Sequence, residues 1–377
     1  MADSSSEPRK ANPGDGPFHI PSLDGIRAIS FFIVFLGHAG LGSIVPGYFG
    51  LSLFFFLSGY LITTLLRLEY EGSGNVSLRQ FYLRRVLRIF PPFYLVLAVA
   101  SLLTYFGLTG GTLWPSGVLA QCLHLTNYWV VRHGWWDGIA PGTWVYWSLA
   151  VEEHFYLVFP LLYIWLQRAG LDRKRQALAL VLLCALVLAW RIVLIYVLGA
   201  DKDRTYVASD TRVDSILAGC ILAIWQNPVL DRDSIDGKRL ARVWLPLGLA
   251  CVFLSLAVRS FRFDQTLRYT LQSFGLLPFF VAAIHWHEHW LFRWLNLRAV
   301  RYLGTLSYSM YLMHTAMLWM FEHWTKWPTP VRSVLALGLL VVFGSLIYRF
   351  VEKPCARMRR RLASYLEPSP DPRNART

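Results

Sequence analysis

Charged residues are scarce in this chain. Of its 377 residues, 55% are hydrophobic and only 16% are charged, and its mean hydropathy is +0.40. One soluble core cannot hide that much apolar surface, because the fraction of surface that a chain buries is limited by its size. The shortage of charge therefore excludes an ordinary soluble globular protein and indicates one that crosses a membrane several times.

Cysteine is also scarce, and none of it forms a recognisable pair. The five cysteines, at positions 122, 184, 220, 251 and 355, form no CxxC motif and several lie in apolar runs, so we interpret them as packing residues. Three histidines alternate in HWHEHW at 285–290, but side chains two residues apart diverge on a helix. We therefore expect an interfacial belt of aromatic and histidine side chains there, and no metal site.

The chain shows neither a signal peptide nor an internal repeat. Residues 1–17 are rich in Ser, Pro, Gly and charge without an apolar core, which argues against a cleaved signal peptide and predicts a disordered cytoplasmic leader. The lack of repeats argues against the inverted halves of many transporters. The net charge of +14 is not gathered in a basic stripe with stacking aromatics, so we expect no nucleic-acid partner.

What the chain has instead is a series of apolar runs of spanning length. A bilayer needs about 20 apolar residues per helix, so we predict an all-α polytopic membrane protein with about ten transmembrane helices. The stretch 109–144 contains Gly, Pro and Trp around a semi-apolar piece, and we expect it to lie in the interface or to re-enter the membrane. The predicted spans are 26–44, 48–67, 88–108, 145–167, 176–198, 211–226, 243–259, 269–286, 302–321 and 331–351.

Basic residues in the connections support this arrangement. Lys and Arg are concentrated in every second connection, as the positive-inside rule requires of cytoplasmic loops. Both termini should then be cytoplasmic, and a further span within 109–144 would break the alternation. We expect residues 18–355 to form the transmembrane domain and residues 356–377 to form a basic, disordered cytoplasmic tail.

Arg27 and His38 are ionisable side chains within the first apolar run. They are eleven residues apart, and a helical rise of about 16 Å returns both side chains to nearly the same face. Ionisable groups at membrane depth are expensive, so the pair predicts a functional route from the cytoplasmic end toward the outer leaflet. The alternative is that Arg27 reaches the interface while His38 joins a polar seam between helices.

Further candidates lie in later spans. Glu152 and Glu153 are adjacent in WSLAVEEHFYLVFP and point about 100° apart on a helix, so we expect one to face a site while the other pairs with a buried arginine. The alternative places both in solvent at the interface. Arg212 and Asp214 do not face each other, so we expect structural ion pairs with partners elsewhere, Glu152 or Glu153 in the case of Arg212. We expect His314, mid-span in LSYSMYLMHT, to be a packing histidine rather than a second catalytic group.

Arg85 and Arg88 lie in the predicted cytoplasmic loop FYLRRVLRIFPPFYL. Because they are three residues apart, they share a helix face and can grip one polyanion together. The alternative is ordinary positive-inside charge. We favour a binding role because Arg27 marks the same cytoplasmic entrance.

Seven motifs occur in one order along the chain. They are the pair of Arg27 and His38, GYFGLSLFFFLSGYLITTLL, the RxxR of Arg85 and Arg88, WSLAVEEHFYLVFP, TRVDSILAG, LSYSMYLMHT and YRFVEKP. Together they closely resemble the acyltransferase-3 family of integral membrane O-acyltransferases, over roughly residues 20–355. The resemblance implies a ten-helix domain that moves an acyl group, usually acetyl, from cytoplasmic acyl-coenzyme A to a hydroxyl of a glycan or glycolipid, often at the outer face of a bacterial inner membrane.

The resemblance and the chemistry of these residue types suggest a division of roles. His38 would act as general base on the acceptor hydroxyl, and Glu152 or Glu153 would orient its imidazole. Three arginines would hold the phosphates of the donor, acetyl-coenzyme A: Arg27, Arg85 and Arg88. The remaining candidates would line the substrate cavity or support it: Tyr156, Arg212, Asp214 and His314.

Two alternatives concern the protein as a whole. Some members of the family carry an additional carboxy-terminal soluble domain, and this chain stops soon after Arg361, so we expect it to act alone or with a separate partner. The competing function from another class is a proton-coupled transporter or flippase that uses the same intramembrane charges. The identity of the acceptor and of the acyl chain stays open, because one fold can serve many substrates.

Overall fold

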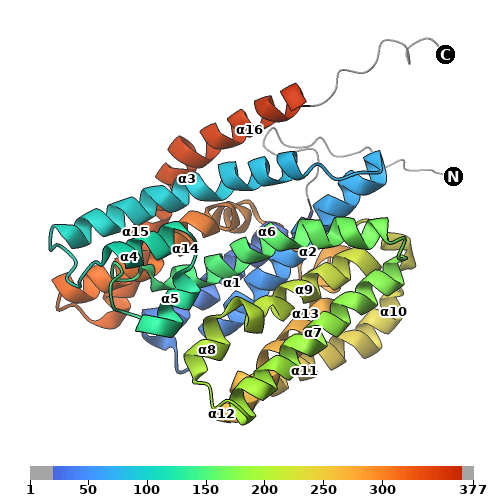
Figure 1. Cartoon of the computed structure of the whole chain (residues 1–377), viewed down its shortest axis with the longest axis horizontal. Coiled ribbons are helices and arrows are strands. Elements are labelled where there is room, and N and C mark those ends of the chain that lie inside the picture. The colour runs from blue at the N-terminus through green and yellow to red at the C-terminus, as the bar shows by residue number, and fades with distance from the viewer. Residues whose placement is uncertain (1–19, 367–377) are drawn as a thin grey trace.

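The computed structural model describes residues 20–366, and every regular element within them is a helix. Ten helices fall on the ten predicted spans and form one bundle (Figure 1), which confirms the all-α class. They are α1 (Leu23–Leu36), α2 (Gly47–Ser73), α3 (Leu78–Tyr105), α6 (Trp147–Arg168), α7 (Arg173–Tyr196), α9 (Ser209–Trp225), α11 (Leu245–Ala257), α13 (Leu267–His285), α14 (Arg298–Trp324) and α15 (Thr329–Ile347).

Two of these ten helices are enclosed by the others. Eight helical stretches of the described residues are long and apolar enough to cross a membrane, and the two predicted spans not among them are α9 and α14. Helix α9 has only 17 residues, and α14 carries a polar face with Ser307, Ser309 and His314. Helix α9 packs against α2, α6, α7 and α13, and α14 packs against α1, α3 and α15. Because protein surrounds them, these two helices need no continuous lipid-compatible surface. The orientation of the termini stays a prediction.

Two glycines let α2 and α9 approach each other backbone to backbone. A Cβ on Gly59 of α2 would lie 1.9 Å from the carbonyl oxygen of Ile216, and a Cβ on Gly219 of α9 would lie 2.0 Å from that of Phe56. Small residues permit such close helix packing in membrane proteins. The contact fixes the position of α2, which carries Ser58 into the site described below.

The stretch 109–144 forms no span. Its helices α4 (Pro115–Cys122) and α5 (Thr126–His133) have eight residues each, or about 12 Å of helix, which is too short to cross a bilayer. The following loop is held against α14, because the Thr315 hydroxyl donates to the Gly142 carbonyl and the Tyr146 hydroxyl donates to the Leu312 carbonyl. The prediction that this stretch adds no transmembrane helix is therefore confirmed.

The segment after α15 differs from its prediction. We expected a disordered tail from residue 356, but the chain continues through the turn Tyr348–Glu352 into helix α16 (Lys353–Leu366), which lies along α3 (Figure 1). A basic, amphipathic segment gains helical order when one face packs on another helix, and the sequence analysis did not consider that contact. The predicted leader at 1–17 and residues 367–377 lie outside the described residues.

The remaining short elements cap the ends of the bundle. The connection between α7 and α9 contains α8 (Lys202–Val207), and the connection between α11 and α13 contains α12 (Phe261–Gln265). The helical turn α10 (Gly237–Arg239) precedes α11. These short elements thus lie in the connections between the long helices.

Candidate functional site

A polar cavity of about 980 Å³ lies among α1, α2, α3, α6 and α14 and reaches the start of α16. It brings together residues from distant parts of the chain, as the sequence analysis expected of a substrate site. The predicted residues that line it are Arg27, Arg85, Arg88, Glu152, Glu153 and Tyr156. The predicted residues that do not line it are His38, Arg212, Asp214 and His314.

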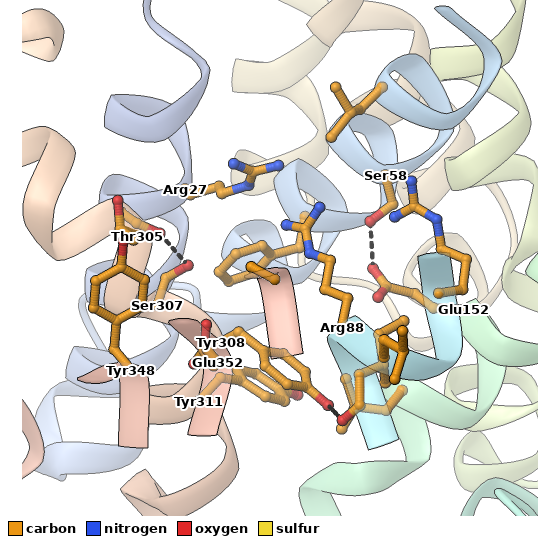
Figure 2. A pocket seen from close by; sticks show the side chains of 18 of the residues that line it. Arg27, Ser58, Arg88, Glu152, Thr305, Ser307, Tyr308, Tyr311, Tyr348 and Glu352 are labelled. Atoms are coloured by element: carbon orange, nitrogen blue, oxygen red, sulfur yellow. Dashed lines mark hydrogen bonds between the residues drawn. The ribbon is translucent and has the colours of Figure 1, made fainter. Parts of the chain in front are cut away.

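Arginines from α1 and α3 face one another across this cavity. Figure 2 shows Arg27 and Arg88 directed into it from their two helices, where their like charges repel. The Arg85 guanidinium lies 5.7 Å from the ring centres of Phe81 and Tyr156, and its buried Nε has no hydrogen-bond partner. Such an orphaned buried donor is costly unless a ligand satisfies it. The cavity therefore has the positive charge and a free donor to hold an anion.

Further cations surround the mouth of the cavity, and the sequence analysis missed their role. We call this set the basic rim: Arg349, Lys353, Arg357, Arg359 and Arg360. Its α16 members are spaced at three and four residues, as in Lys353, Arg357 and Arg360, so they share one helix face. That spacing was a usable signal, but a segment expected to be disordered has no faces.

Acidic and hydroxyl groups line the cavity as well. Glu152 accepts hydrogen bonds from the Ser58 hydroxyl at 2.7 Å (Figure 2) and from the Tyr156 hydroxyl at 3.3 Å. Glu153 lines the same cavity, so the expectation that only one of these carboxylates faces it is wrong. Two side chains about 100° apart can share a cavity when it is wide enough to curve around their helix. Glu352, which sequence analysis did not single out, accepts a hydrogen bond from the Ser309 hydroxyl at 2.5 Å.

His38 is held by another histidine. It lies in the π-helical turn Gly37–Leu41 at the end of α1, and its Nδ1 is 3.1 Å from Nε2 of His314. His314 Nδ1 is 2.6 Å from the carbonyl oxygen of Tyr311. A carbonyl only accepts, so His314 donates from Nδ1 and its Nε2 accepts the Nδ1–H of His38. In the neutral pair, His38 Nε2 therefore keeps its lone pair, as a proton acceptor requires.

The partner of His38 corrects two predictions. Glu152 or Glu153 was expected to orient its imidazole, but the hydrogen bonds of Glu152 go to Ser58 and Tyr156, and the ring nitrogen of His38 is hydrogen-bonded to His314. His314 was expected only to pack, but it makes the hydrogen bond that the carboxylates were expected to make. A histidine 276 positions away, on a helix that contacts α1, could not be matched to His38 from spacing alone.

Tyr311 connects the cavity to the histidine pair. Its side chain lines the cavity and shares a hydrogen bond of 2.6 Å with Ser148. Its ring centre is 5.1 Å from that of His314. Its carbonyl accepts the hydrogen bond that sets the tautomer of His314. The cavity thus extends from the basic rim to Tyr311, and the ring of Tyr311 contacts that of His314.

Arg212 and Asp214 lie apart from this site. Asp214 forms a fully buried ion pair with Arg191 of α7 at 2.6 Å, which fits the predicted structural role but involves a partner that the sequence analysis missed. Arg212 was expected to pair with Glu152 or Glu153, and this is wrong. Its guanidinium lies 3.8 Å from the ring centre of Tyr269. The aromatic face stabilises this buried cation.

The described residues define a helical membrane protein in which a basic cavity extends to Tyr311, whose ring contacts one of a pair of histidines. Residues 20–349 match a family model described as an acyltransferase domain, and the chain belongs to this acyltransferase-3 family. The resemblance inferred from the seven motifs is thereby confirmed.

Several relatives are similar to most of the chain. It is 28% identical over 356 residues to the peptidoglycan O-acetyltransferase OatA of Listeria monocytogenes, which covers 89% of this chain and 56% of OatA. It is also 28% identical to the putative peptidoglycan O-acetyltransferase YrhL of Bacillus subtilis, over 89% of this chain and 55% of YrhL, and to the O-acetyltransferase OatA of Staphylococcus aureus, over 90% and 57%. The chain thus spans a little over half the length of these relatives. No solved structure matches it.

Proposed function

We propose that this protein is an O-acetyltransferase of the inner (plasma) membrane, which moves an acetyl group from cytoplasmic acetyl-coenzyme A to a hydroxyl of a carbohydrate. The observation that carries the proposal is a cavity that joins an unsatisfied arginine donor, Nε of Arg85, to the neighbourhood of an oriented histidine. Family membership and the O-acetyltransferase relatives support the reaction class.

The arginine end of the cavity suits the donor. Coenzyme A carries several phosphate charges, and guanidinium groups bind phosphate through paired, charge-assisted hydrogen bonds. Arg85 and Arg88 present such groups from one face of α3, and Arg27 adds a third from α1. The basic rim would hold the remaining phosphate charge at the cavity mouth. The acyl end of the donor would then extend toward Tyr311.

The histidine end suits removal of a proton from the acceptor. His38 Nε2 takes the hydroxyl proton as the oxygen attacks the thioester carbonyl, and the carbon–sulfur bond then breaks. The proton passes from the imidazolium to the departing thiolate, so that coenzyme A leaves as the thiol and the acetyl ester remains on the acceptor. A positioned general base typically contributes about 10²–10⁴-fold to such a step. His314 Nε2 accepts from Nδ1–H of His38 throughout, which stabilises the imidazolium.

Equilibrium binding of labelled acetyl-coenzyme A to the detergent-purified protein tests the donor half. We expect saturable binding that free coenzyme A displaces and that the double variant Arg85→Ala, Arg88→Ala loses. The matched control is Arg79→Ala, which removes an exposed cation from the same helix outside the cavity. A folded preparation without saturable binding, or a double variant that binds like the control, would overturn the donor assignment.

The base is tested separately. His38→Ala should bind acetyl-coenzyme A normally but lose acetyl transfer, because the arginines assigned to the donor line the cavity and His38 does not. Normal turnover by this variant would remove His38 from the role of base. The transporter alternative uses the same charged residues, but family membership favours the transferase and no observation on the described residues favours transport.

A further inference from the structure

A group of tryptophan rings begins at His38 and extends away from it. The ring centre of Trp144 is 5.2 Å from that of His38, and the ring of Trp144 also contacts Trp135 at 5.3 Å and Trp136 at 5.9 Å. Trp136 in turn lies 5.4 Å from Trp319 of α14. We call these four rings the tryptophan platform: Trp135, Trp136, Trp144 and Trp319. It lies outside the cavity that we assign to the donor.

Part of the platform is exposed and part is anchored. The Trp135 indole donates to the Asp203 carboxylate at 2.9 Å, and the Trp319 indole donates to the Thr109 carbonyl at 3.0 Å. Trp136 is 55% exposed. Within the described residues, the indole N–H groups of Trp136 and Trp144 make no hydrogen bond to the protein. Two rings thus hold the platform in place, while two others offer an aromatic face and a free donor.

The backbone beneath the platform is rigid. Gly142 has a φ of 80°, and a Cβ there would lie 2.3 Å from the backbone nitrogen of Ala316, so this loop lies directly on α14. The hydrogen bond from the Thr315 hydroxyl to Gly142 fixes the same contact, one residue from His314. The loop that carries Trp135, Trp136 and Trp144 is therefore docked on the helix that orients His38. A preorganised surface loses little conformational entropy when a ligand binds.

The chemistry of the platform fits a sugar ring. One face of a pyranose presents several C–H groups that pack on an aromatic ring, while its hydroxyls need hydrogen-bond donors and acceptors around the edge. Tryptophan supplies a large apolar face together with an N–H donor and has few rotatable bonds. Tryptophans of a membrane-interface belt are instead spread around the perimeter of the protein and face lipid. Here four rings gather beside one histidine.

We propose that the tryptophan platform binds a pyranose ring of a glycan acceptor, next to the sugar whose hydroxyl meets His38. This inference rests on the proposed function, because it identifies the acceptor-binding surface of the same reaction. The exposed ring of Trp136 would stack on the sugar, and the indole N–H groups of Trp136 and Trp144 would bind its hydroxyls. Trp135 and Trp319 would act as positioning residues.

The test measures the affinity of three variants for a soluble β-1,4-linked N-acetylglucosamine pentasaccharide. Binding is detected by saturation-transfer NMR in the absence of acetyl-coenzyme A. Trp136→Ala should weaken binding about tenfold, because a stacked aromatic contact is of that order. Trp136→Phe keeps an aromatic face and should retain most of the affinity. The matched control is Trp324→Ala, which removes an indole of similar exposure, 54%, from the same helix as Trp319 but outside the platform.

The same variants are then compared in acetyl transfer to the pentasaccharide. Trp136→Ala should raise KM for the sugar about tenfold while the affinity for acetyl-coenzyme A stays that of the unmodified protein. Wild-type protein that binds acetyl-coenzyme A but not the sugar would overturn the platform and leave the donor site standing. Equal sugar binding by Trp136→Ala and Trp324→Ala would identify the rings as an interfacial belt. Sugar binding that depends on Trp136 without acetyl transfer would support the platform and count against the proposed reaction.

Discussion

His314 determines which nitrogen of His38 carries a proton. The Tyr311 carbonyl accepts from one ring nitrogen of His314, and the other nitrogen then accepts from His38. His314 is fully buried, whereas the His38 side chain is exposed. The buried histidine can therefore orient the exposed one while remaining inaccessible to substrate. If His38 is the base, as proposed, His314 is a positioning residue.

Replacing His314 separates its hydrogen bond from its packing. His314→Leu removes the acceptor, so His38 is no longer restricted to the productive tautomer, and we expect kcat to fall about 10- to 100-fold, within the range of general-base effects. His314→Gln keeps a side-chain acceptor and should restore much of the activity. Steady-state kinetics with both variants, with acetyl-coenzyme A binding as the folding control, checks this. Equal kcat values for the two variants would show that the histidine only fills space.

At the residue scale, the sequence predicted several of the side chains that line the site but not which side chains they contact. Arg27, Arg85 and Arg88 were found because a charged side chain in or beside an apolar run is conspicuous, and the spacing of the last two places them on one face. The partners of His38 and Arg212 were not found, because they depend on which helices pack together. Local sequence contains no information about that choice.

At the element scale, hydropathy located the ten spans. It did not explain why α9 is short or why α14 has a polar face. Helices α9 and α14 are enclosed by other helices, so burial relaxes the demand for length and apolar composition. Helix α16 was missed because its order depends on contact with α3. The close approach of α2 and α9 can be tested by enlarging one of the glycines that permit it.

Enlarging Gly59 should disrupt the bundle. A leucine there would collide with the backbone of Ile216, and neither helix can shift without separating the interface, so we expect a loss of at least 1–3 kcal/mol in stability and a lower yield of monodisperse protein. Gly338→Leu is the matched control, since nothing lies within 4 Å of a Cβ on Gly338 in α15. Size-exclusion profiles and thermal scans in detergent would measure both variants. Similar behaviour of the two would contradict the proposed role of this contact.

Asp231 joins three helices at one end of the bundle. Its carboxylate accepts from Arg67 of α2 at 2.6 Å and from Arg173 of α7 at 3.0 Å, and it follows the end of α9. Burial of this carboxyl opposes its ionisation, but hydrogen bonds from Arg67 outweigh burial and lower its pKa below the ordinary value. A lowered pKa means that the folded state favours the charged form, which contributes stability above the unfolded pKa.

The stability due to Asp231 should depend on pH. Asp231→Asn should cost about 2 kcal/mol near neutral pH, as expected for hydrogen bonds to a charged group. This difference from wild type should shrink as the pH falls below about 4 and the native carboxyl becomes protonated. Asp236→Asn is the control, because its partner Arg239 is 80% exposed and such surface pairs contribute little. Thermal scans from pH 3 to 7 measure the effect, and a difference that grows on acidification would contradict it.

At the scale of the whole molecule, the charge pattern predicts an orientation that the described residues do not test. If every second connection is cytoplasmic, Ser73 faces the cytoplasm and Lys326 faces the outside. Both positions are exposed. In intact cells, an impermeant reagent should therefore reach position 326 but not position 73.

Cysteine labelling checks the orientation. In a background without the five native cysteines, Lys326→Cys should react with a membrane-impermeant thiol reagent in intact cells. Ser73→Cys should react only after the membrane is permeabilised. The reverse pattern would place the basic rim outside and would remove cytoplasmic acetyl-coenzyme A as the donor.

If acetyl-coenzyme A is the donor, the basic rim and the arginines of α3 attract it before contact is made. A concentration of positive charge at a cavity mouth attracts a polyanion through solvent and can raise its association rate by about 10–10³-fold. This attraction extends over a Debye length, about 8 Å at physiological ionic strength, and weakens as salt is added. A sugar without net charge is not drawn in by this field. The ionic strength of the cytosol should therefore control the association rate of acetyl-coenzyme A and leave that of the sugar acceptor unchanged.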